Sequence, residues 1–121
     1  MQSLNLRNGA PRRWSDTLEG IVWLPRLIDK TRAAIAGTLG SYLYGQSPID
    51  RSLLHTLGIG HTEFARIVAS EPDDAAIARS LERRDPQSID RARSWGTNLR
   101  RKYAWFLFVL DVDDGYAGGF W

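Results

Sequence analysis

The sequence predicts an all-α protein, a compact single-domain bundle of about five or six helices. Apolar residues recur every three or four positions through most of the 121-residue chain, which is the period of one face of a helix. Pro25 and Pro48 stand where helices are expected to begin, and Gly58 stands where one is expected to end. The length suits one domain with a single modest core, and no repeat or linker divides it.

The N-terminal part predicts an arm, a short turn and a first long helix. Residues 1–13 show no periodicity, so we expect a flexible arm ahead of one helical domain that spans 14–121. Asp16 and Glu19 have the spacing of a capping box, which predicts one short helical turn. The helix that follows is expected from Pro25 to about residue 38. Its expected inward positions are Leu24, Leu27, Ile28, Thr31, Ala34, Ile35 and Thr38.

Three shorter helices are expected in the middle of the chain. Ser47 is suited to cap the first of them, and Pro48 to occupy its first position. The segment "HTEFARIVAS", 61–70, predicts the second, and the acids Asp73 and Asp74 favour the start of the third. The expected inward residues of the three helices are Ile49, Leu53, Leu54, Leu57, Phe64, Ile67, Val68, Ile77 and Leu81.

The last helix is expected to be long and to begin after Asp85-Pro86. Helical spacing continues through its expected stripe of Ile89, Ala92, Gly96, Leu99, Tyr103 and Phe106. The run "WFLFVL" is also rich in β formers, so a strand is the alternative there, but the unbroken spacing favours helix. The C-terminal tail 111–121, "DVDDGYAGGFW", is rich in glycine and aromatic residues and predicts irregular structure.

Composition excludes several classes of protein. The absence of cysteine excludes disulfides, thiolate catalysis and cysteine-containing zinc sites. The longest apolar run, "YAWFLFVL", is far shorter than the roughly 20 residues that span a bilayer. We therefore expect a cytoplasmic protein with no membrane partner. Net charge is only +2, and only 79–102, with eight cations against three acids, offers a basic surface, so nucleic acid is disfavoured as a partner.

Several segments resemble a known bacterial family. The pieces "LPRLIDKTRA", "GSYLYG", "DRSLLHTLGIGHTEFARIV" and "FLFVLDVDDG" occur in an order similar to that of domain of unknown function 5069, over roughly residues 17–115. The most specific element is Leu24-Pro25-Arg26 with Ile28-Asp29-Lys30 and Arg32. The resemblance implies a compact all-helical domain and no established activity, so it assigns no catalytic residue. The tail "YAGGFW" departs from the family pattern.

The charged residues of the first long helix are the main candidates for function. Arg26, Asp29 and Lys30 lie on one side of that helix, where the small Ala33 and Gly37 leave room for another element to cover them. A buried acid and amine have shifted pKa values and can transfer protons near neutral pH. Asp29 and Lys30 are therefore the catalytic candidates. The substrate-binding candidates are Arg26 and Arg32 for an anionic group, Tyr42 and Tyr44 as phenol donors, and His55 and Trp23.

These residues predict a small-molecule pocket that uses no cofactor. The expected reaction is an isomerisation, cyclisation, elimination or hydrolysis in an aromatic-lined site. No metal is expected, because the two histidines lack ligand spacing and "DVDDG" fails the EF-hand pattern. Its acids are expected to bind a helix N-terminus or an arginine of 79–102. Two alternatives remain open at this point: the charges form a solvated helix face, or the protein is a non-catalytic interaction module, such as a homodimer.

Overall fold

The computed structural model describes residues 6, 9–40 and 47–114, and it confirms the mostly helical prediction. Within these residues one small hairpin precedes six helices. The strands of the hairpin are β1 (Thr17–Leu18) and β2 (Ile21–Val22). The helices are α1 (Leu24–Ala36), α2 (Pro48–Leu57), α3 (His61–Ser70), α4 (Asp74–Arg84), α5 (Ser88–Lys102) and α6 (Ala104–Asp113).

The helical turn expected at Asp16–Glu19 is wrong, because this segment forms the hairpin. Thr17 pairs with Val22 and Leu18 pairs with Ile21 in antiparallel register. The two residues between the strands, Glu19 and Gly20, have φ angles of 54° and 78°. Two successive positive φ angles give the tight turn whose twist matches an antiparallel pair. Asp16 instead accepts a hydrogen bond from the backbone N–H of Arg13.

The next four helices begin and end close to the expected residues. Pro25 lies in the first turn of α1, and Gly37 ends that helix with φ 75°. Gly58 likewise ends α2 with φ 72°. Asp73 caps α4 by accepting a hydrogen bond from the N–H of Ala76. The proline and glycine signals of the sequence therefore predicted these helix limits correctly.

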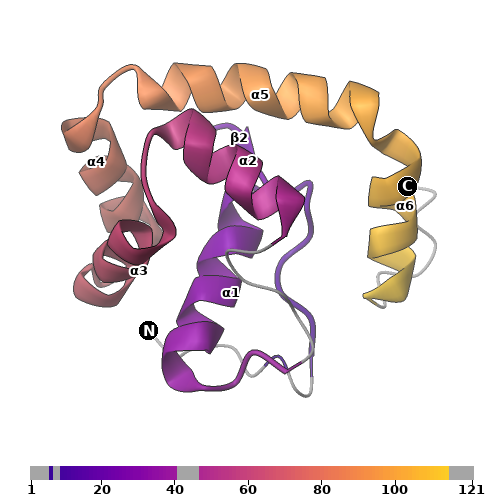
Figure 1. The fold of residues 1–121 in the computed structure, drawn as a ribbon, viewed down its shortest axis with the longest axis horizontal. Helices are drawn as coiled ribbons and strands as arrows, with labels where there is room; N and C mark the ends of the chain where they lie inside the picture. The colour runs from indigo at the N-terminus through magenta and orange to yellow at the C-terminus, as the bar shows by residue number, and fades with distance from the viewer. Residues whose placement is uncertain (1–5, 7–8, 41–46, 115–121) are drawn as a thin grey trace.

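The core forms around the first turns of α1. Figure 1 shows α5 lying across one end of the molecule, with α3 and α4 on one side of α1 and α6 on the other. Ile35 was expected to face inward, but it is 54% exposed, because the last turn of α1 extends beyond the core. The largest fully buried side chains of α1 to α6 include Leu24, Leu27, Ile28, Leu53, Leu57, Phe64, Ile77 and Leu107.

The long final helix is broken at Tyr103, which the sequence did not predict. Tyr103 has φ −122° and ψ 27°, so α5 ends at Lys102 and α6 turns away from it (Figure 1). The favoured helix is confirmed for "WFLFVL", and the strand alternative is wrong. Because of the break, Tyr103 and Phe106 are 41% and 48% exposed instead of buried, and Leu107 enters the core. In the part of the chain that the structure describes, no helix is long and apolar enough to cross a membrane.

Candidate functional site

The charged side of α1 is buried, which excludes the alternative of a solvated helix face. Arg26, Asp29 and Lys30 are 2%, 7% and 3% exposed. Ala33 is fully buried, whereas a side chain at Gly37 would meet no atom within 4 Å. Burial of ionised groups requires compensating charges or hydrogen bonds, so the partners of these three residues define the site.

Lys30 pairs with an acid of α2. Its Nζ lies 2.8 Å from Oδ2 of Asp50, which is completely buried. The indole N–H of Trp23 donates to Oδ1 of Asp50 at 2.8 Å, and the Lys30 ammonium lies 5.6 Å from the centre of the Trp23 ring. Burial lowers the pKa of Lys30, and the attraction of Asp50 offsets only part of this effect.

Arg26 pairs with the end of α6. Its guanidinium donates to Oδ2 of Asp114 at 2.7 Å, and both side chains are 3% exposed. The same group donates to the backbone carbonyl of Arg12 at 3.3 Å and lies 5.2 Å from the centre of the Trp23 ring. One side chain therefore ties α1 to the N-terminal segment and to α6.

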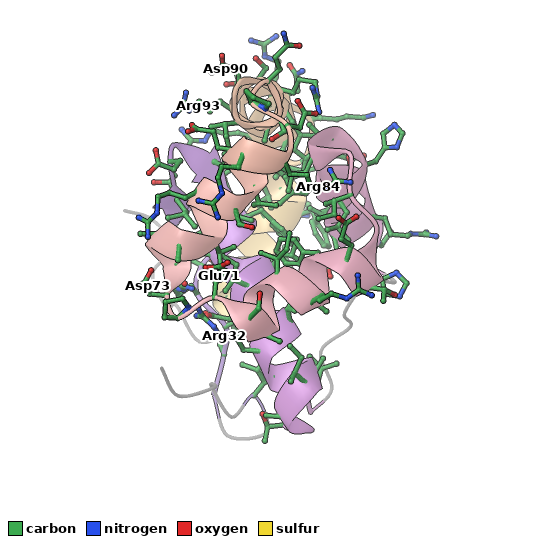
Figure 2. The ribbon with its side chains drawn as sticks, turned by 90° about the vertical axis from the view of Figure 1, so that its left-hand side faces the viewer. Arg32, Glu71, Asp73, Arg84, Asp90 and Arg93 are labelled. Carbon is green, nitrogen blue, oxygen red and sulfur yellow. The ribbon has the colours of Figure 1, made fainter. Side chains whose placement is uncertain are left out.

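Asp29 pairs with Arg12, a residue of the expected arm. Oδ2 of Asp29 accepts from the backbone N–H of Arg12 at 2.8 Å, and the guanidinium donates to both carboxylate oxygens. Burial opposes the charge of Arg12, but hydrogen bonds to Asp74 and Asp29 outweigh this effect and raise the pKa of Arg12. Arg32 also contacts Asp74, at 3.0 Å. Figure 2 shows Arg32 near Asp73, by the start of α4.

A third group of contacts lies near the hairpin. Asp111 of α6 is fully buried and accepts from the guanidinium of Arg13 at 2.9 Å and from the indole N–H of Trp14 at 3.1 Å. The guanidinium of Arg100 lies 5.4 Å from the centre of the Trp14 ring. The acids of "DVDDG" were expected to bind a helix N-terminus or an arginine of 79–102. This is wrong for Asp111 and Asp114, whose arginine partners are Arg13 and Arg26.

Together these contacts form what we call the α1 charge network. It joins the N-terminal segment, α1, α2, the start of α4 and the end of α6, and its formal charges cancel. Its cations are Arg12, Arg13, Arg26, Lys30 and Arg32, and its acids are Asp29, Asp50, Asp74, Asp111 and Asp114. Such a network holds distant segments of the chain together. Its buried lysine, Lys30, has a pKa lowered towards neutral pH, which is the property that proton transfer requires.

Not every predicted site residue joins this network. Arg32 is one of its cations and Trp23 contacts its members, whereas His55 lies on the exposed side of α2. Tyr42 and Tyr44 lie outside the described residues. Among the residues that the structure describes, no three histidines and acids gather as they would around a metal ion. The basic residues of 79–102 include Arg93, which pairs with Asp90 on α5, far from Arg32 in Figure 2.

A pocket lies apart from the α1 charge network, between α2, α5 and α6. Its volume is about 500 Å³, and its walls are mainly apolar and aromatic. The indole N–H of Trp95 in its wall donates to the hydroxyl of Ser52 at 2.8 Å. The pocket is lined by Ser47, Pro48, Ile49, Ser52, Trp95, Asn98, Leu99, Lys102, Tyr103 and Phe106.

The sequence did not predict the position of the pocket or six of the ten residues of the α1 charge network. We predicted an aromatic-lined pocket from the sequence but expected it beside Arg26 and Lys30. These two charges lie in the segment that most specifically resembles the family. Tyr103, at the break between α5 and α6, lines the pocket, and no proline or glycine marks that break. Arg12 and Asp114 lie 17 and 88 residues from their α1 partners, so local spacing carries no signal for them.

Comparison with models of protein families gives a match. A family model described as "Domain of unknown function (DUF5069)" matches residues 8–106. No curated protein matches the sequence. The matched region contains every cation of the α1 charge network but ends before Asp111 and Asp114, the two acids that α6 brings to it.

Proposed function

This chain belongs to the DUF5069 family, a domain of unknown function, and on that premise we propose that it is a small-molecule-binding protein. The ligand occupies the pocket between α2, α5 and α6. It has a flat or aliphatic apolar body and carries one negative charge. The family supplies no activity, so this proposal rests on the residues of the chain itself.

The observation that carries the proposal is the composition of the pocket wall. A volume of about 500 Å³ falls within the range of roughly 300–1,000 Å³ that is typical of small-molecule sites. The rings of Trp95, Tyr103 and Phe106 favour an apolar body. Lys102 and Asn98 are the polar groups able to orient it, and the Lys102 ammonium favours an anionic end.

In this proposal the α1 charge network supports the pocket instead of lining it. No residue of the network is among those that line the pocket. The Arg26–Asp114 and Arg13–Asp111 pairs join α6 to the N-terminal half of the chain. Because α6 supplies Phe106 to the pocket wall, these pairs fix the position of that wall. Removing one partner of a buried pair costs about 3–5 kcal/mol, so the position is held firmly.

The test measures binding by isothermal titration calorimetry with naphthalene-2-carboxylate, a flat apolar anion. Asn98→Phe fills the pocket and is expected to abolish binding. Thr97→Phe, on the neighbouring exposed position of α5 outside the pocket, is the matched control and is expected to bind normally. Equal affinities of the two variants, or no binding to the wild type at millimolar ligand, would contradict the proposal.

Lys102 provides a second arm of this test. Lys102→Met is expected to weaken binding of the carboxylate by about 1.5–5-fold, the value of a solvent-accessible ion pair. The neutral 2-naphthamide should bind both proteins alike. If the variant weakens both ligands equally, Lys102 contributes apolar contact and the ligand is not an anion.

A second candidate function is cofactor-independent acid–base catalysis by the α1 charge network. Asp29 and Lys30 would transfer protons or stabilise charge in an isomerisation, cyclisation, elimination or hydrolysis. What favours it is the lowered pKa of Lys30, caused by burial, in a pair whose Asp50 directly follows the pocket residue Ile49. Turnover of a pocket ligand that is lost in a folded Lys30→Met variant would support it. Recovery of every bound ligand unchanged would contradict it.

A further inference from the structure

One helix of this protein presents far more apolar surface than the others. The sequence of α6, "AWFLFVLDVD", is apolar on all sides, yet only Leu107 and Asp111 are buried. A helix that is apolar all round is normally enclosed by other elements. Figure 1 places α6 at the edge of the molecule, where its outer side meets no other helix. This sequence therefore suits a surface that is covered by something else.

The exposed side chains of α6 form a continuous line. Trp105, Val109 and Val112 are spaced by four and three residues, and they are 76%, 43% and 48% exposed. Phe106, 48% exposed, flanks them, and Phe108 stacks on Trp105 with ring centres 5.6 Å apart. We call Trp105, Phe106, Val109 and Val112 the α6 outer face. Elsewhere in the described residues, the strongly exposed large apolar side chains are Ile35 and Tyr103.

We propose that the α6 outer face binds the same face of a second copy of this chain, with the two α6 helices antiparallel. The charges at the helix ends select this partner and this direction. Arg101 is exposed just before α6, and Asp113 is exposed at its end. Asp111 and Asp114 are engaged within the molecule, so Asp113 remains as the acid presented at the surface.

An antiparallel pair brings opposite charges together at both ends. A ten-residue helix is about 15 Å long, so when the two helices lie side by side each Arg101 meets the partner's Asp113. A parallel pair would instead place like charges together. The two helix dipoles also oppose each other favourably in the antiparallel arrangement. The contact is isologous, and it closes at two copies.

The contact is expected to be reversible. Four large apolar side chains on one short helix cover less than the roughly 800 Å² that each partner supplies to a standard interface. We therefore expect a dissociation constant on the order of micromolar. Phe106 belongs to both the pocket wall and the α6 outer face, whereas Trp105, Val109 and Val112 do not line the pocket, so a substitution at Val109 tests the dimer separately from the pocket.

The test is sedimentation velocity of the full chain from about 1 to 200 µM, a range that brackets the expected constant. The wild type is expected to shift from monomer to dimer. Val109→Asp should remain monomeric, while Ile35→Asp, the matched change at an exposed aliphatic residue of α1, should dimerise normally. A wild type that is monomeric throughout overturns the proposal, as does a mass that rises beyond two copies.

Charge exchange tests the antiparallel direction. Arg101→Asp and Asp113→Arg each place like charges together and should weaken the dimer by at least about 5-fold, the combined effect of two exposed ion pairs. The double variant restores opposite charges and should recover the wild-type constant. Failure of the double variant to recover overturns the proposed direction.

Discussion

The ammonium group of Lys30 lies 2.8 Å from Oδ2 of Asp50, and these side chains are 4% and 0% exposed. Two opposite charges this deep in a protein stabilise each other but lose their hydration. The pair is therefore expected to be costly to break and inexpensive to replace as a unit. Two charges that act as a pair can therefore be distinguished from two independent charges by comparing single and double substitutions.

Asp50→Leu is predicted to lower the free energy of unfolding by about 3–5 kcal/mol, because it leaves the Lys30 charge buried without its partner. The double variant Lys30→Met/Asp50→Leu removes both charges and should recover at least about 2 kcal/mol of that loss. Urea denaturation of the wild type, both single variants and the double variant measures the coupling. Additive losses would show that the pair does not act as a unit.

The contribution of Asp74 to stability is predicted to depend on pH. Burial opposes the charge of Asp74, but hydrogen bonds and charge attraction from Arg12 and Arg32 together outweigh it, Arg12 contributing most, and lower the pKa of this carboxyl below its ordinary 3.8. A lowered folded-state pKa adds stability that is complete above the ordinary value and is lost as pH falls through the folded value. The wild type should therefore exceed Asp74→Asn in stability at pH 6, and the excess should shrink towards pH 2.

Arg12→Met provides the control for this pH effect. Without the Arg12 hydrogen bond, the pKa of Asp74 loses the main cause of its lowering. In the Arg12→Met background, the stability change caused by Asp74→Asn should therefore vary much less with pH. Chemical denaturation at each pH gives both comparisons. If the wild type exceeds Asp74→Asn in stability by the same amount at pH 6 and at pH 2, the lowered pKa of Asp74 is contradicted.

The sequence predicted local features well and distant ones poorly. Pro25 in the first turn of α1 and Gly58 directly after α2 mark these helix limits through the backbone properties of proline and glycine, which act within a few residues. The hairpin was missed because Glu19 lacks the typical turn signal and only Gly20 supplies one. The break at Tyr103 was missed because apolar residues continue at helical spacing on both sides of it.

The residues of the α1 charge network likewise divide into local ones, which the sequence indicates, and distant partners, which it does not. The residues of α1 were identified because their charges interrupt an apolar stripe within one helix. Their partners Asp50 and Asp114 come from segments that only the tertiary fold brings near, so no spacing in the sequence identifies them. Burial of the charged side depends on those distant segments, and for this reason the solvated alternative remained open until the fold was known.

Gly96 is predicted to be required for the contact between α5 and β2. A Cβ atom at this position would lie 2.7 Å from Cγ2 of Val22. Gly96→Ala should therefore destabilise the protein by about 1–3 kcal/mol, although alanine itself favours a helix. In a Val22→Ala background the same substitution should be neutral or stabilising by up to about 1 kcal/mol. Thermal denaturation would contradict this argument if both backgrounds responded alike.

Glu19 is predicted to carry backbone strain in the hairpin turn. A residue with a side chain is disfavoured at φ 54°, and asparagine before glycine is the preferred sequence for this turn. Glu19→Asn should raise the free energy of unfolding by about 0.5–1 kcal/mol. Glu19→Gln keeps the length of the side chain and should give no such gain. If both substitutions change the free energy of unfolding equally, the change comes from the loss of the Glu19 charge and not from relief of strain. That charge lies near Arg93, whose Nη2 is 4.0 Å from Oε2 of Glu19.

Asp114→Asn is predicted to loosen α6 and thereby to weaken the pocket. The substitution removes the negative charge that the buried Arg26 guanidinium contacts at 2.7 Å, so α6 loses its ion pair with α1 and Arg26 is left without that compensating charge. Hydrogen exchange of backbone amides in α6 should become at least about 10-fold faster, whereas amides of α3 should be unaffected. Asp113→Asn, at the exposed neighbouring acid, is the matched control, and at protein concentrations below the expected dimer dissociation constant it should leave both rates unchanged. If Asp114→Asn leaves exchange in α6 unchanged but reduces affinity for naphthalene-2-carboxylate, then the pair does not act by holding the pocket wall.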